Sequence, residues 1–203
     1  MDVIQILQRS LSGYAFVLPT ALLYFFLLSK RKKTQFWSHI VTALIFLYYL
    51  IGVFTMTGIG KLKAFSPKLV LIPFRDMISG PVDTALNVLL FVPLGIFLPI
   101  MYKSFNKLNK VAVLGFMLSL TIELIQMFGH GTTDINDLIT NTVGACLGFG
   151  IYKIAEKIAN QRFDKFKANK INDLSEIAFF TALSLIIMIT VQPIVIHELF
   201  KLG

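Results

Sequence analysis

Six stretches of this 203-residue chain are apolar over 18 to 23 residues each, and no other feature restricts the fold as strongly. A helix needs about 20 consecutive apolar residues to cross the hydrocarbon core of a bilayer. A membrane β-barrel would show shorter segments of alternating polarity instead. The pattern therefore predicts an all-α polytopic membrane protein, a single membrane domain over 1–203 with six transmembrane helices at 11–29, 36–58, 83–102, 111–129, 135–152 and 177–196.

The composition agrees with a membrane protein, because 56% of the residues are hydrophobic and only 15% are charged. The segment at 11–29 could also be a cleaved signal peptide. It lacks a basic region before it, and the sequence KRKK at 30–33 follows it, which is the pattern of a stop-transfer helix. We therefore expect this helix to remain in the protein.

Basic residues predict the orientation, because Lys and Arg are retained in cytoplasmic loops. The loops after the first, third and fifth apolar segments carry four, three and six of them, so that 13 of the 19 lie on one side. Both termini are then expected to face outward. The net charge of +8 requires no nucleic acid, since basic loops against an anionic inner leaflet explain it.

The acidic residues gather at the opposite end of the chain's central helices. Five of the eleven lie where the third helix begins, the fourth ends and the fifth begins, and these are Asp76, Asp83, Glu123, Asp134 and Asp137. With the predicted orientation this end faces outward. Uncharged polar residues lie near them, and the complete set of candidate ligand-binding residues is Glu123, Gln126, Asp134, Asp137, Asn141, Asn87 and Arg75.

The spacing of these residues predicts that they share helix faces. Glu123 and Gln126 are three residues apart, and His130 would continue their stripe if the helix persisted that far. Asp134, Asp137 and Asn141 repeat the pattern, and the sequence GACLG at 144–148 extends it with two small residues that allow a neighbouring backbone to approach closely. Stripes on consecutive helices can converge on one outward-opening polar pocket.

Structural roles compete with ligand binding for several of these residues. Asp134 could simply cap the fifth helix. Glu123 costs about 2.5–3.5 kcal/mol at membrane depth, and pairing with Arg75 could offset that cost. Asn87 and Asn141 could serve only as interhelical hydrogen bonds. A divalent-cation site of Glu123, Asp134, Asp137 and His130 is conceivable, but no spacing matches a known metal loop, so no metal is predicted.

Four motifs follow one another along the chain, namely LIPFRD at 71–76, LNVLLFVPLGIFLP at 86–99, SLTIELIQMF at 119–128 and TDINDLITNTVGACLGFGIY at 133–152. In this combination they resemble the VanZ-like family of membrane proteins, over a core at about 69–152. The resemblance implies a cell-envelope protein, and the family's founder is associated with resistance to the glycopeptide antibiotic teicoplanin. It implies neither a reaction nor a cofactor.

Three functions remain open. The first is a membrane protein that binds or alters a lipid-linked cell-wall precursor, an anionic glycopolymer or the glycopeptide antibiotic itself, and so lowers teicoplanin susceptibility. The second is an enzyme acting on a lipid-linked phosphate or glycan, with Glu123 or Asp137 as general base or with carboxylates that hold a cation. The third is a small transporter, which the absence of a sequence repeat and of charge near the membrane midplane disfavours.

Overall fold

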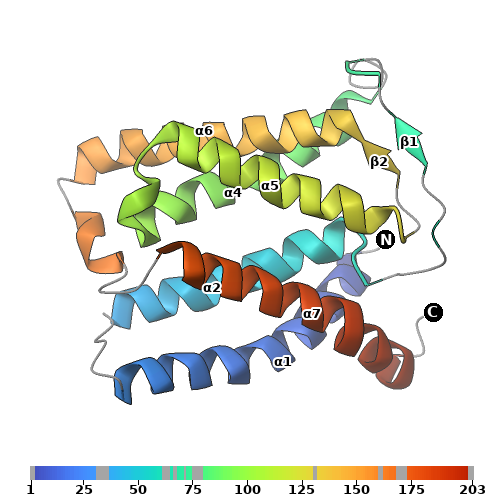
Figure 1. The fold of residues 1–203 in the computed structure, drawn as a ribbon, viewed down its shortest axis with the longest axis horizontal. Helices are drawn as coiled ribbons and strands as arrows, with labels where there is room; N and C mark the ends of the chain where they lie inside the picture. The colour runs from blue at the N-terminus through green and yellow to red at the C-terminus, as the bar shows by residue number, and fades with distance from the viewer. Residues whose placement is uncertain are drawn as a thin grey trace. The chain divides into compact units, whose positions relative to one another are not determined.

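The computed structural model describes residues 3–30, 37–60, 65, 68–70, 72–74, 80–129, 132–159, 162–167 and 173–200. Within these ranges it contains six long helices, which are α1 (Val3–Lys30), α2 (Trp37–Met56), α4 (Pro81–Met101), α5 (Leu108–Gln126), α6 (Ile135–Ala159) and α7 (Asp173–Phe200). All six are long and apolar enough to cross a membrane. The all-α prediction with six transmembrane helices is therefore confirmed (Figure 1).

Two helices end elsewhere than their predicted apolar segments, and the end of α5 affects the site. α6 continues to Ala159, well beyond the apolar segment, and is followed by a short 3-10 helix, η2 (Arg162–Phe166). α5 ends at Gln126, and its last turn is closed by Phe128 and Gly129, whose amides donate to the carbonyls of Ile125 and Gln126. The helical stripe of Glu123 and Gln126 therefore does not reach His130, which lies outside the described residues.

The helices pack as two compact units, one made from residues 1–64 and 168–203 and the other from residues 65–167. We call them unit 1 and unit 2. In unit 1, α1, α2 and α7 contact one another around a core of apolar side chains. Gly13 of α1 lies so close to α7 that a Cβ there would be 2.7 Å from the sulfur of Met188. Whether the two units form the predicted single domain stays a prediction.

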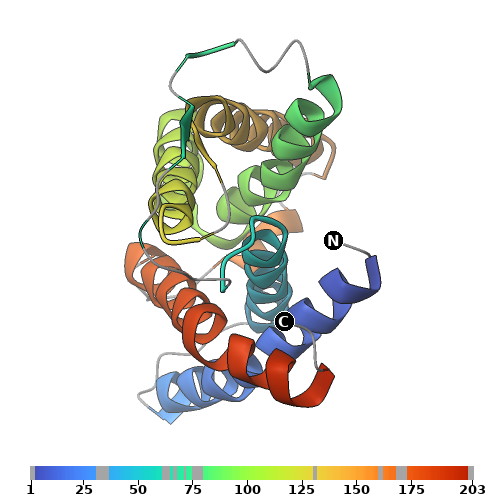
Figure 2. The ribbon, with the colours of Figure 1, turned by 90° about the vertical axis from the view of Figure 1, so that its right-hand side faces the viewer.

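Unit 2 is a bundle of α4, α5 and α6 in which α6 packs most extensively against α4 (Figure 2). Small residues bring these two helices into backbone contact. A Cβ on Gly144 or Gly148 would lie 2.2 Å and 2.0 Å from the carbonyl oxygens of Val88 and Val92 on α4, respectively. The close approach predicted from GACLG is thus confirmed, and α4 is the neighbouring helix.

Two short strands tie the segment before α4 to the start of α6. β1 (Leu69–Val70) runs parallel to β2 (Thr133–Asp134), and the amide of Thr133 donates to the carbonyl of Lys68 at 2.8 Å. Shortly after β1, Phe74 has a φ of 68°, a left-handed conformation that is rare for a bulky residue. The strand pairing thereby attaches residues 68–70, just before the motif at 71–76, to the end of unit 2 where α6 begins.

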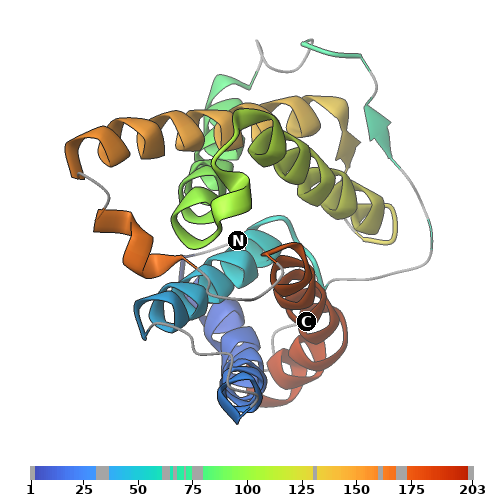
Figure 3. The same cartoon turned by 60° about the vertical axis from the view of Figure 1, so that its left-hand side comes forward.

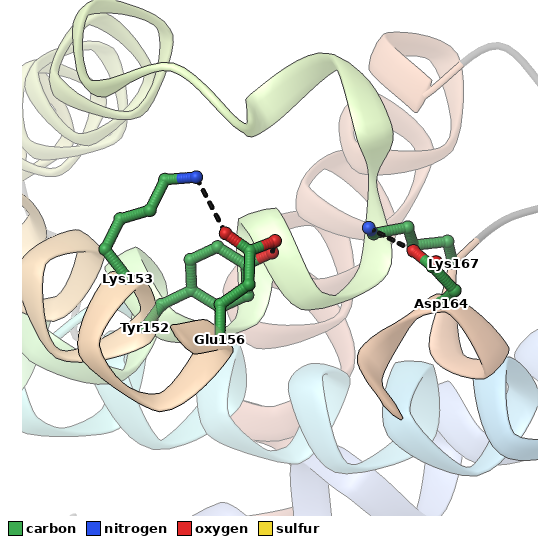
Figure 4. Close-up of polar contacts among 5 residues, drawn as sticks. All are labelled: Tyr152, Lys153, Glu156, Asp164 and Lys167. Atoms are coloured by element: carbon green, nitrogen blue, oxygen red, sulfur yellow. Dashed lines mark hydrogen bonds and ion pairs between the residues drawn. The ribbon is translucent and has the colours of Figure 1, made fainter. Parts of the chain in front are cut away.

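The opposite end of unit 2 contains η1 (Lys103–Phe105) and η2, which follows α6 and contacts α4 and α6 (Figure 3). The carboxylates of Glu156 and Asp164 at this end of unit 2 each pair with a lysine. Glu156 accepts hydrogen bonds from Tyr152 at 2.5 Å and from Lys153 at 2.8 Å, and Asp164 accepts one from Lys167 (Figure 4). The hydrogen bond from Lys167 lowers the pKa of Asp164 below its usual range. Acid groups at this end therefore have nearby cations.

Candidate functional site

The start of α4, the end of α5 and the start of α6 lie at one end of unit 2 (Figure 1), and these segments carry the predicted site residues that the structure describes. This placement follows from the antiparallel order of three helices joined by short connections. We call this region the acidic end of unit 2, and it contains the four carboxylates Asp83, Glu123, Asp134 and Asp137. It lies at the other end of α6 from the lysine-paired Glu156.

Glu123 is 3% exposed and lies at the N-terminus of α6, although it belongs to α5. Its Oε2 accepts a hydrogen bond from the backbone amide of Asp134 at 2.8 Å, and its own carbonyl accepts one from the Thr133 hydroxyl at 3.0 Å. Free amides and the helix dipole stabilise a negative charge at such a position. These contacts offset part of the cost of a carboxylate near the membrane.

Asp134 caps α6, as one interpretation of the sequence predicted. Its Oδ1 accepts hydrogen bonds from the backbone amide of Asn136 at 2.8 Å and from the Asn136 side chain at 2.9 Å. The first is the contact that an N-cap carboxylate makes with the second residue of a helix. Capping leaves room for a second role, because a carboxylate has lone pairs for several hydrogen bonds.

Asn136 is a site residue that sequence reasoning missed. It is 3% exposed, and its Oδ1 accepts a hydrogen bond from the backbone amide of Phe74 at 2.7 Å. It therefore connects the left-handed turn after β1 to the first turn of α6. Its position two residues after a capping Asp was the available signal, since this spacing is typical of local Asx hydrogen bonds.

The two other asparagines form hydrogen bonds between helices. Asn87 of α4 donates to Oδ1 of Asp137 on α6, and Asn141 of α6 donates to the hydroxyl of Ser119 on α5 at 2.9 Å. The structural role that the sequence left open is thus present for both. Ser119 was missed, although its position four residues before Glu123 places it on the same face of α5.

Two features of the acidic end of unit 2 are not explained by these hydrogen bonds. Oδ1 of Asn141 is buried and has no hydrogen-bond partner among the described residues. The carboxyl groups of Asp134 and Asp137 also lie within electrostatic range of Glu123, and Asp83 lies within that range of Asp137. None of the ion pairs between described residues involves any of these four carboxylates.

The remaining candidates are less defined. Gln126 is half-buried at the last residue of α5. Arg75 lies outside the described residues, so its expected pairing with Glu123 stays a prediction. Among described residues no group of three His, Cys, Asp or Glu side chains can hold a metal ion. An apolar groove between α5 and α6 is lined by other residues, including Phe116, Leu138 and Cys146, and the polar pocket stays a prediction.

Comparison with known proteins decides the family. The VanZ/LLP1 family model matches residues 16–156, which include α2, α4, α5, most of α6 and every candidate site residue. The chain belongs to this family. The match begins well before the core expected at about 69–152.

A curated relative agrees with this assignment. The chain is 43% identical to protein VanZ of Enterococcus faecium over 90 aligned residues. The aligned region covers 44% of this chain and 51% of the relative. The chain thus spans about half the length of this relative. No solved structure matches the chain. Together with its six apolar helices, the relationship identifies a multi-pass membrane protein.

Proposed function

We propose that this chain is a cell-envelope membrane protein that lowers susceptibility to teicoplanin, with the acidic end of unit 2 as its recognition site. Membership of the VanZ/LLP1 family supports the phenotype, since the founder of this family is associated with teicoplanin resistance. One observation carries the site. Four carboxylates lie at neighbouring ends of three helices, and none of them forms an ion pair among the residues that the structure describes. Ionisable residues at such positions are expensive and are typical of functional sites.

The proposed partner is an extracytoplasmic envelope component or the antibiotic, because basic residues favour the opposite end of unit 2 for the cytoplasm. Lipid-linked cell-wall precursors, anionic glycopolymers and glycopeptide antibiotics are all candidates. The described contacts favour recognition over general-base catalysis. Glu123 and Asp137 each already accept a hydrogen bond from another element, and Asp134 caps α6.

The orientation can be tested by labelling single cysteines in a variant that lacks Cys146. Val82→Cys places an exposed thiol at the start of α4, and Lys165→Cys places one in η2. An impermeant maleimide should label Val82→Cys in intact cells, and Lys165→Cys only after permeabilisation. Labelling of Lys165→Cys in intact cells would show that the acidic end faces the cytoplasm.

The function can be tested with Glu123→Gln, Asp134→Asn and Asp137→Asn in a teicoplanin-sensitive host at matched membrane levels. Each amide keeps an oxygen that can accept the hydrogen bond described above, so charge is lost while the helix contacts survive. We expect the parent to raise the inhibitory concentration of teicoplanin. Each variant should return it most of the way to that of the host alone.

The matched control is Glu156→Gln, which removes a carboxylate from the other end of α6, the helix of Asp137. It should protect as well as the parent. Equal protection by all three site variants would mean that the charges serve no function there. A parent that gives no protection would contradict the proposed phenotype itself.

A further inference from the structure

A column of polar side chains continues inward from the acidic end, between α5 and α6. We call Ser119, Glu123, Asp137 and Asn141 the polar column. Within each helix the two members are four residues apart, so they lie on one face about 6 Å from each other. The Asn141–Ser119 hydrogen bond and the contact of Glu123 with the start of α6 hold the two faces together.

The inner end of this column has an unused acceptor. Asn141 is 3% exposed, its amide nitrogen bonds Ser119, and its Oδ1 has no partner in the part of the chain that the structure describes. Helical side chains lean toward the N-terminus of their helix. Because α6 begins at the acidic end, Asn141 leans along the column toward Asp137.

Buried polar atoms without a protein partner usually bind water or an ion. A water molecule would satisfy Asn141 but would leave the negative charge of the acidic end unchanged. A cation would do both, because the carboxyl groups of Glu123 and Asp137 stand one helical turn from Ser119 and Asn141 and form no ion pair with a described cation. The exposed side chain of Lys68, near the start of α6, forms no described ion pair with these carboxylates.

We propose that the polar column binds a small monovalent cation, Na⁺, through Oδ1 of Asn141, the hydroxyl of Ser119 and the adjacent carboxylates. In membrane transporters Na⁺ is coordinated by carbonyl oxygens, and the side-chain carbonyl of Asn141 offers one here. Divalent ions need more charged ligands, and the described residues offer no group of three acidic or His side chains around one point. This site goes beyond the proposed function and does not depend on the antibiotic.

Ion binding should stabilise the purified full-length protein, because a ligand that binds only the folded state shifts the unfolding equilibrium. The apparent Tm is measured in detergent at constant ionic strength while choline chloride is replaced by NaCl. We expect a saturable rise of about 2–4 °C. The same Tm in both salts would overturn the proposal, leaving water or Arg75 to satisfy the column.

Single substitutions test which side chains bind Na⁺. Asn141→Ala removes the unpartnered oxygen and should abolish the Na⁺ response, whereas Thr142→Val should retain it, because the Thr142 hydroxyl donates to the Leu138 carbonyl of its own helix. If Asn141→Ala does not fold, Ser119→Ala removes a ligand while keeping Asn141, and the half-saturating Na⁺ concentration should rise at least several-fold. A parental Na⁺ response in whichever of these site variants folds would overturn the site. Loss of teicoplanin protection would not, since no antibiotic enters this measurement.

Discussion

The substitution Gly148→Ala is expected to destabilise unit 2 strongly. The added Cβ would lie 2.0 Å from the carbonyl oxygen of Val92 and 3.0 Å from the Cα of Gly95. Backbone atoms cannot rotate away as a side chain can, so α4 and α6 would have to separate. Overpacking of this kind typically costs about 1–3 kcal/mol, and we expect the upper part of that range. The measurement is the free energy of unfolding in mixed micelles.

Gly150→Ala is the matched control on the same helix. Beyond the neighbouring backbone of its own helix, no atom lies within 4 Å of a Cβ at that position, which is exposed. Alanine favours helix over glycine by about 1 kcal/mol, so this variant should be as stable as the parent or slightly more stable. Equal stability of Gly148→Ala and Gly150→Ala would contradict the close approach of α4 and α6.

The same contact connects packing to the candidate site. Gly144 lies against Val88 of α4, next to Asn87, which bonds Asp137. Separating the two helices would therefore lengthen this hydrogen bond as well. The small residues of α6 thus position the acidic end, although none of them can contact a ligand through a side chain.

Much of this fold could be predicted because hydropathy and segment length act locally along the chain. The six helices follow from apolar runs, and the backbone contact follows from the spacing of Gly144 and Gly148. The partner of that contact could not be predicted, since any helix with a smooth face would have fitted. For the same reason the sequence did not reveal that Asn87 would meet Asp137 and that Asn141 would meet Ser119.

Contacts between distant residues were harder still. Asn136 accepts its hydrogen bond from the backbone amide of Phe74, which is 62 residues away. Phe74 adopts a left-handed conformation, and because it is not a glycine the sequence gives no sign of it. The β1–β2 pairing is only two residues long, too short for any alternation of polarity to show. What the sequence did indicate was the concentration of acidic residues at one end, because it depends only on helix order.

The most consequential contact that the sequence did not reveal lies in unit 1. His39 at the start of α2 and Glu176 in the first turn of α7 are both fully buried, with Nε2 and Oε1 2.8 Å apart. Tyr24 of α1 interacts with the same carboxyl group. All three helices of unit 1 thus meet at one polar cluster inside an otherwise apolar bundle.

Breaking this pair should cost more than any surface change in unit 1. His39→Leu leaves the buried carboxyl of Glu176 without the imidazole, and removing one partner of a buried pair typically costs about 3–5 kcal/mol. The control is Glu198→Gln on α7, the helix of Glu176. Glu198 pairs with His197, and both side chains are about three-quarters exposed. Exposed pairs contribute about 0–1 kcal/mol, so this variant should unfold like the parent.

The double variant His39→Leu/Glu176→Met tests whether the two side chains stabilise unit 1 through their contact with each other. Replacing a buried pair by apolar residues of similar volume is often neutral or stabilising, because the cost of removing both groups from water disappears. We therefore expect the double variant to recover most of the free energy of unfolding lost in His39→Leu. Losses that add instead would mean that the two side chains act independently, and that packing rather than their contact holds α2 against α7.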